Sequence, residues 1–207
     1  MQQVSKEEGY RFEKYGGTSR FASYAYQIAE ILKTAPNDVL EIGVGDAVVG
    51  SYIKRQSTIR YTWADIAEDL RPDVVADVRA LPFGDNSFDT VCAFEVLEHI
   101  PFADFEKALS ELARVAKKYV LISLPHFGPP VKILLKIPFL PEIKLAFKFP
   151  FHPEHHFNGQ HYWEIGKRGY SPARIRKILS KYGAVTNEFV PFENQYHHFF
   201  VLQIRGH

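Results

Sequence analysis

One short stretch, VLEIGVGDAVVG at residues 39–50, limits the possible folds of this chain more than any other. Its apolar beginning is typical of a strand that is buried on both faces of a parallel sheet. Gly43 and Gly45 follow at once, and glycine permits a sharp turn and the close approach of a ligand to the backbone. Residues 47–56 can form a helix whose first amides point toward that turn. Strand, turn and helix together predict a site for a nucleotide-type cofactor.

The spacing of the glycines argues against the dinucleotide fingerprint G-x-G-x-x-G, because its third glycine would fall at Val48. The pattern Glu41-x-Gly43-x-Gly45 instead resembles the first motif of class I S-adenosylmethionine (SAM)-dependent methyltransferases. In that family the acid and the glycine turn hold the amino-acid end of SAM. The family often has a third glycine where this chain has Ala47. A glycine pair after a strand can also form an ordinary tight turn, so the rest of the chain must decide.

Two further acids follow strands in the pattern of a cofactor site. Asp65 ends a predicted strand at residues 60–64, about twenty residues beyond the glycines, where a strand-helix-strand unit returns an acid beside its cofactor. The alternative role of Asp65 is a helix N-cap. Asp77 begins the phrase DVRALPF, which resembles the D-x-x-x-LPF segment of the same methyltransferases. The resemblance implies that Asp65 with Ile66 binds the ribose and that Asp77 with Val78 faces the adenine.

The run SFDTVCAFEVLEHI is the most specific part of the resemblance, because it closely resembles the corresponding run of small-molecule methyltransferases of the type 11-like group. Ligands of open α/β sheets bind outside the carboxyl ends of the strands, so Glu95, Glu98 and His99 are expected at the methyl-transfer centre. The resemblance places Glu95 among the cofactor-binding residues. His99 and His126 are candidate catalytic bases, since imidazole titrates near neutral pH. The alternative is that Glu98 and His99 cap the next helix or orient the loop.

The order of predicted elements gives an α/β fold with a Rossmann-like, doubly wound sheet of seven strands. This is the class I methyltransferase fold that the resemblance implies, with an antiparallel pair of strands at its end. Helices are expected at residues 19–32, capped by Ser19, at 47–56, at 102–116, and at 172–182 with Ser171 as N-cap. The expected strands are residues 39–42, 60–64, 74–76, 90–94, 119–124, 184–190 and 199–204.

Residues 126–162 interrupt this rhythm just before the last helix. Six prolines stand among the many Phe, Leu and Ile residues of this segment, and they argue against one continuous helix. Four lysines recur in steps of four or eight residues, a basic amphipathic pattern. We expect a lid-like insertion; the alternatives are a pocket for an apolar acceptor and peripheral membrane contact through residues 131–151. The lysines are Lys132, Lys136, Lys144 and Lys148.

The insertion also contains the run H-x-x-H-H at residues 152–156, followed by His161. These imidazoles could supply zinc ligands. However, the chain has no second cysteine, proline and glycine interrupt the segment, and most methyltransferases of the group that the chain resembles need no zinc. We therefore expect no metal.

Length and composition favour one soluble domain over residues 1–207, with an N-terminal arm at residues 1–18 that folds over the site or is loose. A hydrophobic content of 46% with 24% charged residues is typical of globular proteins. The net charge of +1 creates no field that would attract nucleic acid. The single cysteine, Cys92, and the absence of a secretory signal or of apolar runs of membrane-spanning length favour a cytoplasmic location.

Together these features predict a SAM-dependent methyltransferase that acts on an apolar or anionic small molecule and releases S-adenosylhomocysteine (SAH). The methyl group would pass by direct in-line displacement, which depends mainly on proximity and alignment. A non-catalytic SAM-binding interaction module is the main alternative. A nucleotide-dependent oxidoreductase is disfavoured by the missing third glycine. The sequence does not indicate the acceptor or the oligomeric state.

Overall fold

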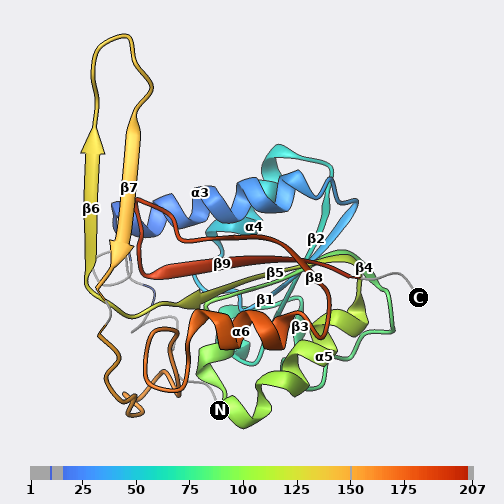
Figure 1. The fold of residues 1–207 in the computed structure, drawn as a ribbon. Coiled ribbons are helices and arrows are strands. Elements are labelled where there is room, and N and C mark those ends of the chain that lie inside the picture. The colour runs from blue at the N-terminus through green and yellow to red at the C-terminus, as the bar shows by residue number, and fades with distance from the viewer. Residues whose placement is uncertain (1–9, 11–15, 150, 205–207) are drawn as a thin grey trace.

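The computed structural model describes residue 10 and residues 16–149 and 151–204, which form a three-layer α/β domain (Figure 1). Its sheet consists of β1 (Asp38–Ile42), β2 (Arg60–Asp65), β3 (Val74–Val75), β4 (Phe88–Phe94), β5 (Ala116–Pro125), β8 (Ala184–Phe189) and β9 (His197–Gln203). The helices are α3 (Thr18–Lys33), α4 (Val48–Gln56), α5 (Phe105–Val115) and α6 (Pro172–Leu179), with short 3-10 turns at η1 (Glu68–Leu70), η2 (Leu97–His99) and η3 (Phe102–Asp104).

The seven strands have the order β3-β2-β1-β4-β5-β9-β8. The first five are parallel to one another, and β9 is antiparallel to both of its neighbours. This confirms the predicted doubly wound sheet and its antiparallel end. Parallel strands place their carboxyl ends at one edge, so the segments that follow β1, β2 and β4 meet there.

Most helix boundaries agree with the sequence, and one predicted cap is wrong. Ser171 caps α6, because its hydroxyl accepts a hydrogen bond from the Arg174 amide at 3.2 Å. By contrast, α3 begins at Thr18 with Gly17 at the N-cap position, and Ser19 lies inside the first turn. Gly17 has a φ of 148°, a conformation that favours glycine over serine. The short connection between β2 and β3 contains the single turn η1, as its length predicts.

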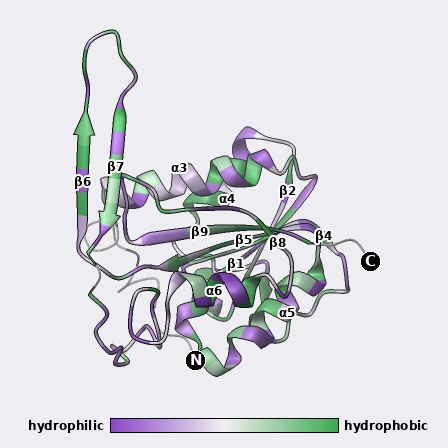
Figure 2. Cartoon of the chain, in the orientation of Figure 1, coloured by the Kyte–Doolittle hydropathy of each residue, from purple (hydrophilic) through white to green (hydrophobic). Residues whose placement is uncertain are grey.

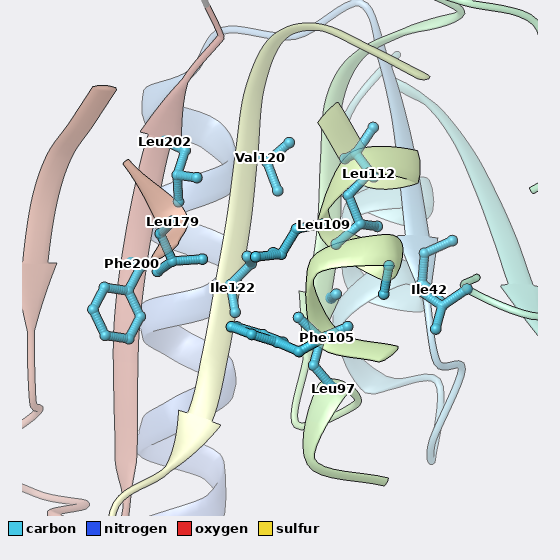
Figure 3. Close-up of a cluster of buried hydrophobic side chains, with 14 of the residues drawn as sticks. Ile42, Leu97, Phe105, Leu109, Leu112, Val120, Ile122, Leu179, Phe200 and Leu202 are labelled. Carbon is cyan, nitrogen blue, oxygen red and sulfur yellow. The ribbon is translucent and has the colours of Figure 1, made fainter. Parts of the chain in front are cut away.

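Adjacent residues of the central strands pack into opposite layers, because strand side chains alternate between faces. Leu121 belongs to the cluster under α3 and α4, whereas Ile122 belongs to the cluster under α5 and α6. Figure 3 shows this second cluster, in which Phe105 and Leu109 of α5 lie beside Ile122. Fully burying such a side chain contributes about 1.5–3 kcal/mol. Cys92 is buried in the first cluster.

The insertion forms a separate antiparallel hairpin, β6 (Pro130–Leu135) and β7 (Ile143–Lys148), which extends away from the sheet (Figure 1). The expectation that this segment contains no continuous helix is confirmed. Its hydrophobic residues, green in Figure 2, remain largely exposed, and Phe139 at the tip is fully exposed. Within the described ranges, no helix combines the length and the apolar character needed to cross a bilayer.

Candidate functional site

A cavity of about 320 Å³ lies at the carboxyl ends of β1, β2 and β4. The site therefore occurs where open parallel sheets bind ligands. Of the residues expected from the sequence, the cavity is lined by Gly43, Asp65, Ile66, Asp77, Val78, Glu95 and His99.

The glycine turn forms the floor of this cavity. Gly43 and Gly45 have φ angles of +86° and +55°, in the region that favours glycine. A Cβ atom added to Gly43 would lie 2.5 Å from Cγ2 of Val96, so the turn and the loop after β4 touch at this point. Ala47, at the position of the family's third glycine, also has a left-handed φ of 62°. The sequence of the turn thus leaves bare backbone facing the cavity.

Asp65 fastens this turn to the end of β2. Its Oδ2 accepts a hydrogen bond from the Val44 amide at 2.7 Å, and its Oδ1 accepts one from the Ala67 amide at 2.8 Å. Burial raises the pKa of Asp65, and these two amides act in the opposite direction. The N-cap of η1 is Ala67, so Asp65 does not take the alternative role of a helix N-cap.

Asp77 lines the cavity, but its carboxylate is paired within the protein. Arg79 donates to it through Nε at 2.9 Å and Nη2 at 2.6 Å, and through Nη1 to Asp104 at 2.8 Å. The guanidinium of Arg79 lowers the pKa of Asp77, which therefore stays ionised. Val78 is buried next to Asp77, and Ile66, just after β2, is exposed. Both side chains contribute apolar surface to the wall of the cavity.

Glu41 and Gly45 line a smaller recess of about 30 Å³ on the α3 side of the turn, together with Arg20 of α3. Glu41 is buried and its Oε2 accepts a hydrogen bond from Nε1 of Trp63 at 3.0 Å. Burial raises the pKa of Glu41 to about 8. Gly50 of α4 packs against the same indole, since a Cβ atom there would overlap Nε1 of Trp63.

The loop after β4 brings Glu95 and His99 to the cavity. Glu95 has a φ of +54° and its Oε1 accepts a hydrogen bond from the Ser123 hydroxyl at 2.8 Å; burial raises its pKa to about 7. His99 lies in η2 with Nδ1 at 3.1 Å from the Gln160 carbonyl oxygen. Burial lowers the pKa of His99 to about 4, so its imidazole is neutral at pH 7.

The second candidate base, His126, does not line the cavity. Its ring stacks on His198 at a centroid distance of 5.0 Å, with the two Nδ1 atoms 3.1 Å apart. Its backbone carbonyl accepts a hydrogen bond from Lys148. Burial lowers the pKa of His126 to about 3. His126 follows the carboxyl end of β5, as the sequence predicts. This end of β5 leads into the insertion and does not reach the cavity.

Several lining residues were missed, among them Tyr10, Arg20, Arg79 and Tyr162. Tyr162 belongs to the phrase HYWEIG, which precedes the last helix, so a signal for it was present. Tyr10 belongs to the expected N-terminal arm, most of which lies outside the described residues. Within the described part of the predicted insertion at residues 126–162, Tyr162 lines the cavity and the hairpin residues 130–148 do not.

Comparisons with known proteins agree with this geometry. Residues 40–123 match the protein-family model described as "Methyltransferase domain". No curated protein matches the chain. A solved structure of 1,6-didemethyltoxoflavin-N1-methyltransferase from Burkholderia thailandensis, with bound 1,6-didemethyltoxoflavin and SAH, is 15% identical with a TM-score of 0.61, and the match covers 90% of this chain and 78% of that one.

Two further structures show the same fold. Magnesium protoporphyrin IX methyltransferase from Synechocystis PCC 6803, with bound SAM, is 17% identical with a TM-score of 0.56, covering 90% of this chain and 80% of that one. The cyclase SpnF is 14% identical with a TM-score of 0.59, covering 96% of this chain and 87% of that one. At these identities the matches show the fold alone, and that fold also serves reactions other than methyl transfer.

Proposed function

We propose that this chain is a SAM-dependent methyltransferase, which binds SAM in the cavity and methylates a small-molecule acceptor in the cytoplasm; the match of residues 40–123 to a methyltransferase domain and the class I methyltransferase fold of the sheet support this proposal. The observation that carries this proposal is the bare-backbone turn at Gly43, fastened by Asp65 at the edge of the sheet. A Cβ atom at position 43 would overlap the side chain of Val96, so glycine is the residue that lets the turn pack against the loop after β4 while its backbone lines the cavity. A ligand in the cavity can therefore contact this backbone directly.

The smaller recess and the larger cavity would bind different parts of SAM. The recess with Glu41, Gly45 and Arg20 offers a guanidinium for the carboxylate of a methionine moiety and a carboxyl oxygen of Glu41 that can accept a hydrogen bond from its amino group. Each carboxylate oxygen of Asp65 accepts one hydrogen bond from a backbone amide, of Val44 or of Ala67. Each oxygen can accept a further hydrogen bond, from a ribose hydroxyl.

The larger cavity suits the adenine ring. Ile66 and Val78 provide apolar surface on its walls. Since Arg79 already occupies the carboxylate of Asp77, an adenine amine would share these oxygens with the guanidinium. We therefore assign Asp77 a smaller part in binding than the sequence resemblance implies, and Val78 a larger one.

When bound, SAM supplies an electrophilic methyl group on a sulfonium and leaves as SAH. The chain's own part is to hold the acceptor in line, which can contribute several orders of magnitude to the rate. His99 faces the cavity but has a pKa of about 4, so it is a weak base at pH 7. This favours positioning of the acceptor over proton abstraction by the bare imidazole.

Calorimetric titration with SAM and SAH tests the cofactor assignment. Asp65→Asn keeps the size of the side chain but cannot accept from both amides, so SAH affinity should fall at least about tenfold. Asp85→Asn is the matched control, because Asp85 is exposed and pairs with Arg114 away from the cavity. Failure of the folded wild-type chain to bind SAM or SAH would refute the proposal.

A non-catalytic SAM-binding module remains the second candidate, and the cyclase among the structural neighbours is the observation that favours testing it. Methyl transfer from labelled SAM to a panel of apolar and anionic small molecules distinguishes the two. Transfer to any member supports the enzyme. Cofactor binding without transfer across a broad panel would favour the module.

We also propose that the hairpin at residues 130–148 contacts an anionic membrane surface. Its large apolar side chains are about half exposed or more, including Leu134, Leu145 and Phe147. The segment contains four lysines and one glutamate, a positive excess that matches anionic headgroups.

Flotation with vesicles of phosphatidylcholine and phosphatidylserine tests this contact. The double variant Phe139→Ser with Leu140→Ser should lose at least half of the bound fraction, since it removes the apolar tip. Tyr52→Ser, an exposed aromatic residue on α4, is the control and should bind like the wild type. Equal binding by all three proteins, or no binding by any, would contradict the proposal.

A further inference from the structure

Three metal-ligating side chains converge at the edge of the cavity. Glu98 and His99 come from η2 after β4, and His161 comes from the end of the insertion. One ligand atom from each residue lies within 4.8 Å of the others. Among the described residues, this is the group of three histidine and acidic side chains whose ligand atoms lie close enough together to hold one metal ion.

Glu98 is the central observation. Its side chain is fully buried, and neither carboxylate oxygen has a hydrogen-bond partner among the described residues. Burying a carboxyl group without a partner is costly, and such a group in a native fold needs a physical reason. Glu95, Glu164 and Arg20 are charged or titratable groups that face Glu98. A bound cation would supply the partner that both carboxylate oxygens of Glu98 lack among the described residues.

Both imidazoles are held by their Nδ1 atoms. His99 contacts the Gln160 carbonyl oxygen through Nδ1, and its Nε2 lies 3.8 Å from Oε1 of Glu98. His161 contacts Oε1 of Glu164 through Nδ1 at 2.9 Å. The same Glu164 oxygen accepts a hydrogen bond from the Tyr196 hydroxyl at 3.0 Å. Metal-bound histidines are typically oriented in this way, with carbonyl or carboxylate oxygens behind them.

We propose that Glu98, His99 and His161 bind one divalent transition-metal ion, with zinc as the ion that this ligand set suits best. Two imidazoles and one carboxylate are a common set for zinc sites that keep a fourth position open. Ligand atoms about 2.1 Å from a tetrahedral ion lie about 3.4 Å apart, so the cluster closes by roughly 1 Å on binding.

This site shares His161 with the zinc ligands that the sequence suggested and then disfavoured, but its other ligands are Glu98 and His99. In the H-x-x-H-H run, His152 contacts the Gly166 carbonyl oxygen and His155 contacts the His161 carbonyl oxygen. The run therefore supports the backbone near the cluster and does not form it. His161 lies more than sixty residues after the adjacent pair Glu98 and His99, a separation that no short motif would reveal.

An ion bound at this position would take part in binding the acceptor, an inference that rests on the proposed methyltransferase function. His99 lines the cavity, so the open coordination position would face the acceptor. A hydroxyl of the acceptor bound there would be positioned for methyl transfer and made more acidic, so that it could release its proton to solvent as the new O–C bond forms and the S–C bond of SAM breaks.

The test is equilibrium dialysis of the full, chelator-stripped chain against Zn²⁺, with metal content measured per chain. The wild type should bind one ion, and Glu98→Gln and His161→Ala should each weaken binding by at least about tenfold. Glu164→Gln, which removes the carboxylate behind His161, should weaken it by about tenfold or more. His156→Ala removes an exposed imidazole of the same segment and should leave the affinity unchanged.

X-ray absorption of the zinc-loaded wild type gives a second measurement that needs no variant to fold. It should show two imidazole ligands with oxygen completing the sphere. Absence of zinc binding by the wild type, equal binding by Glu98→Gln, or a sphere without imidazole would overturn the proposal. SAH titration of the metal-free chain is measured separately, so failure of the metal site and failure of the cofactor assignment can be told apart.

Discussion

The central sheet and the hairpin of the insertion have similarly apolar sequences but opposite surroundings. Every residue of β1 is buried, whereas five of the six residues of β6 are exposed. The sheet is covered by helices on both faces, and the hairpin extends from the domain with no layer against it (Figure 1). Apolar composition therefore predicts burial only where the topology supplies a second layer.

Among substitutions that compare the packing of the sheet with that of the insertion, the largest loss of stability is expected at the glycine turn. Gly43→Ala combines a strained φ of +86° with a contact 2.5 Å from Val96, and should cost about 2–5 kcal/mol of unfolding free energy. SAH binding should be lost with it. Gly159→Ala in the insertion also has a positive φ but no atom within 4 Å of the added Cβ, so about 1–2 kcal/mol is expected. Equal costs in urea unfolding would show that the sheet is packed no more tightly than the insertion.

An intermediate effect is expected at the junction of the two regions. Burial lowers the pKa of His198 to about 4, whereas an unfolded histidine titrates near 6.5. Between these values only the unfolded state is protonated, so stability is complete above pH 6.5 and is lost as the pH falls toward 4. His198 faces Glu188, Lys148, Arg176 and His126, and the carboxylate opposes this shift.

His198→Phe should remove this dependence. The difference in unfolding free energy between wild type and variant should change by about 1 kcal/mol between about pH 7.5 and pH 5.5, with the wild type losing more on acidification. Urea unfolding at the two pH values measures it. His156→Ala, which removes an exposed imidazole, should leave the dependence as in the wild type. A constant difference for His198→Phe would mean that folding leaves the pKa of His198 at its unfolded value, and a difference of the opposite sign would mean that the folded chain raises it.

The smallest effect is expected from removing the hairpin. Replacing residues 131–147 by the dipeptide Asn-Gly should change the unfolding free energy by less than about 1 kcal/mol, because its apolar side chains are exposed and its ion pair from Lys144 to Glu193 lies at the surface. SAH affinity should stay within about threefold of wild type, since the described hairpin residues do not line the cavity. Destabilisation above about 3 kcal/mol would break the comparison by showing that the hairpin supports the domain.

The sequence predicted the sheet well because each strand has local signals. The apolar runs, the glycines after β1, the acid that ends β2 and the acids that follow β3 and β4 are all short-range patterns, and the topology then brings them to one edge. The cavity residues Gly43, Asp65, Ile66, Asp77, Val78, Glu95 and His99 were predicted in this way.

Other parts were not predictable because they depend on contacts between distant residues. The pairing of Arg79 with Asp77 and Asp104 has no sequence motif. The meeting of Glu98 with His161 requires the insertion to fold back beside η2. The hairpin itself was not foreseen, since lysines at steps of four or eight and frequent prolines fit several conformations equally well.

The packing of Trp63 has a consequence for how related sequences can vary. Gly50 leaves no room for a Cβ under the indole, and the indole supplies the N–H that the buried Glu41 accepts. A relative with a larger residue at position 50 must therefore carry a smaller one at position 63, and then loses the donor to position 41. Positions 41, 50 and 63, on two strands and a helix, should change together or not at all during divergence, so that an alignment would show them as one covarying set.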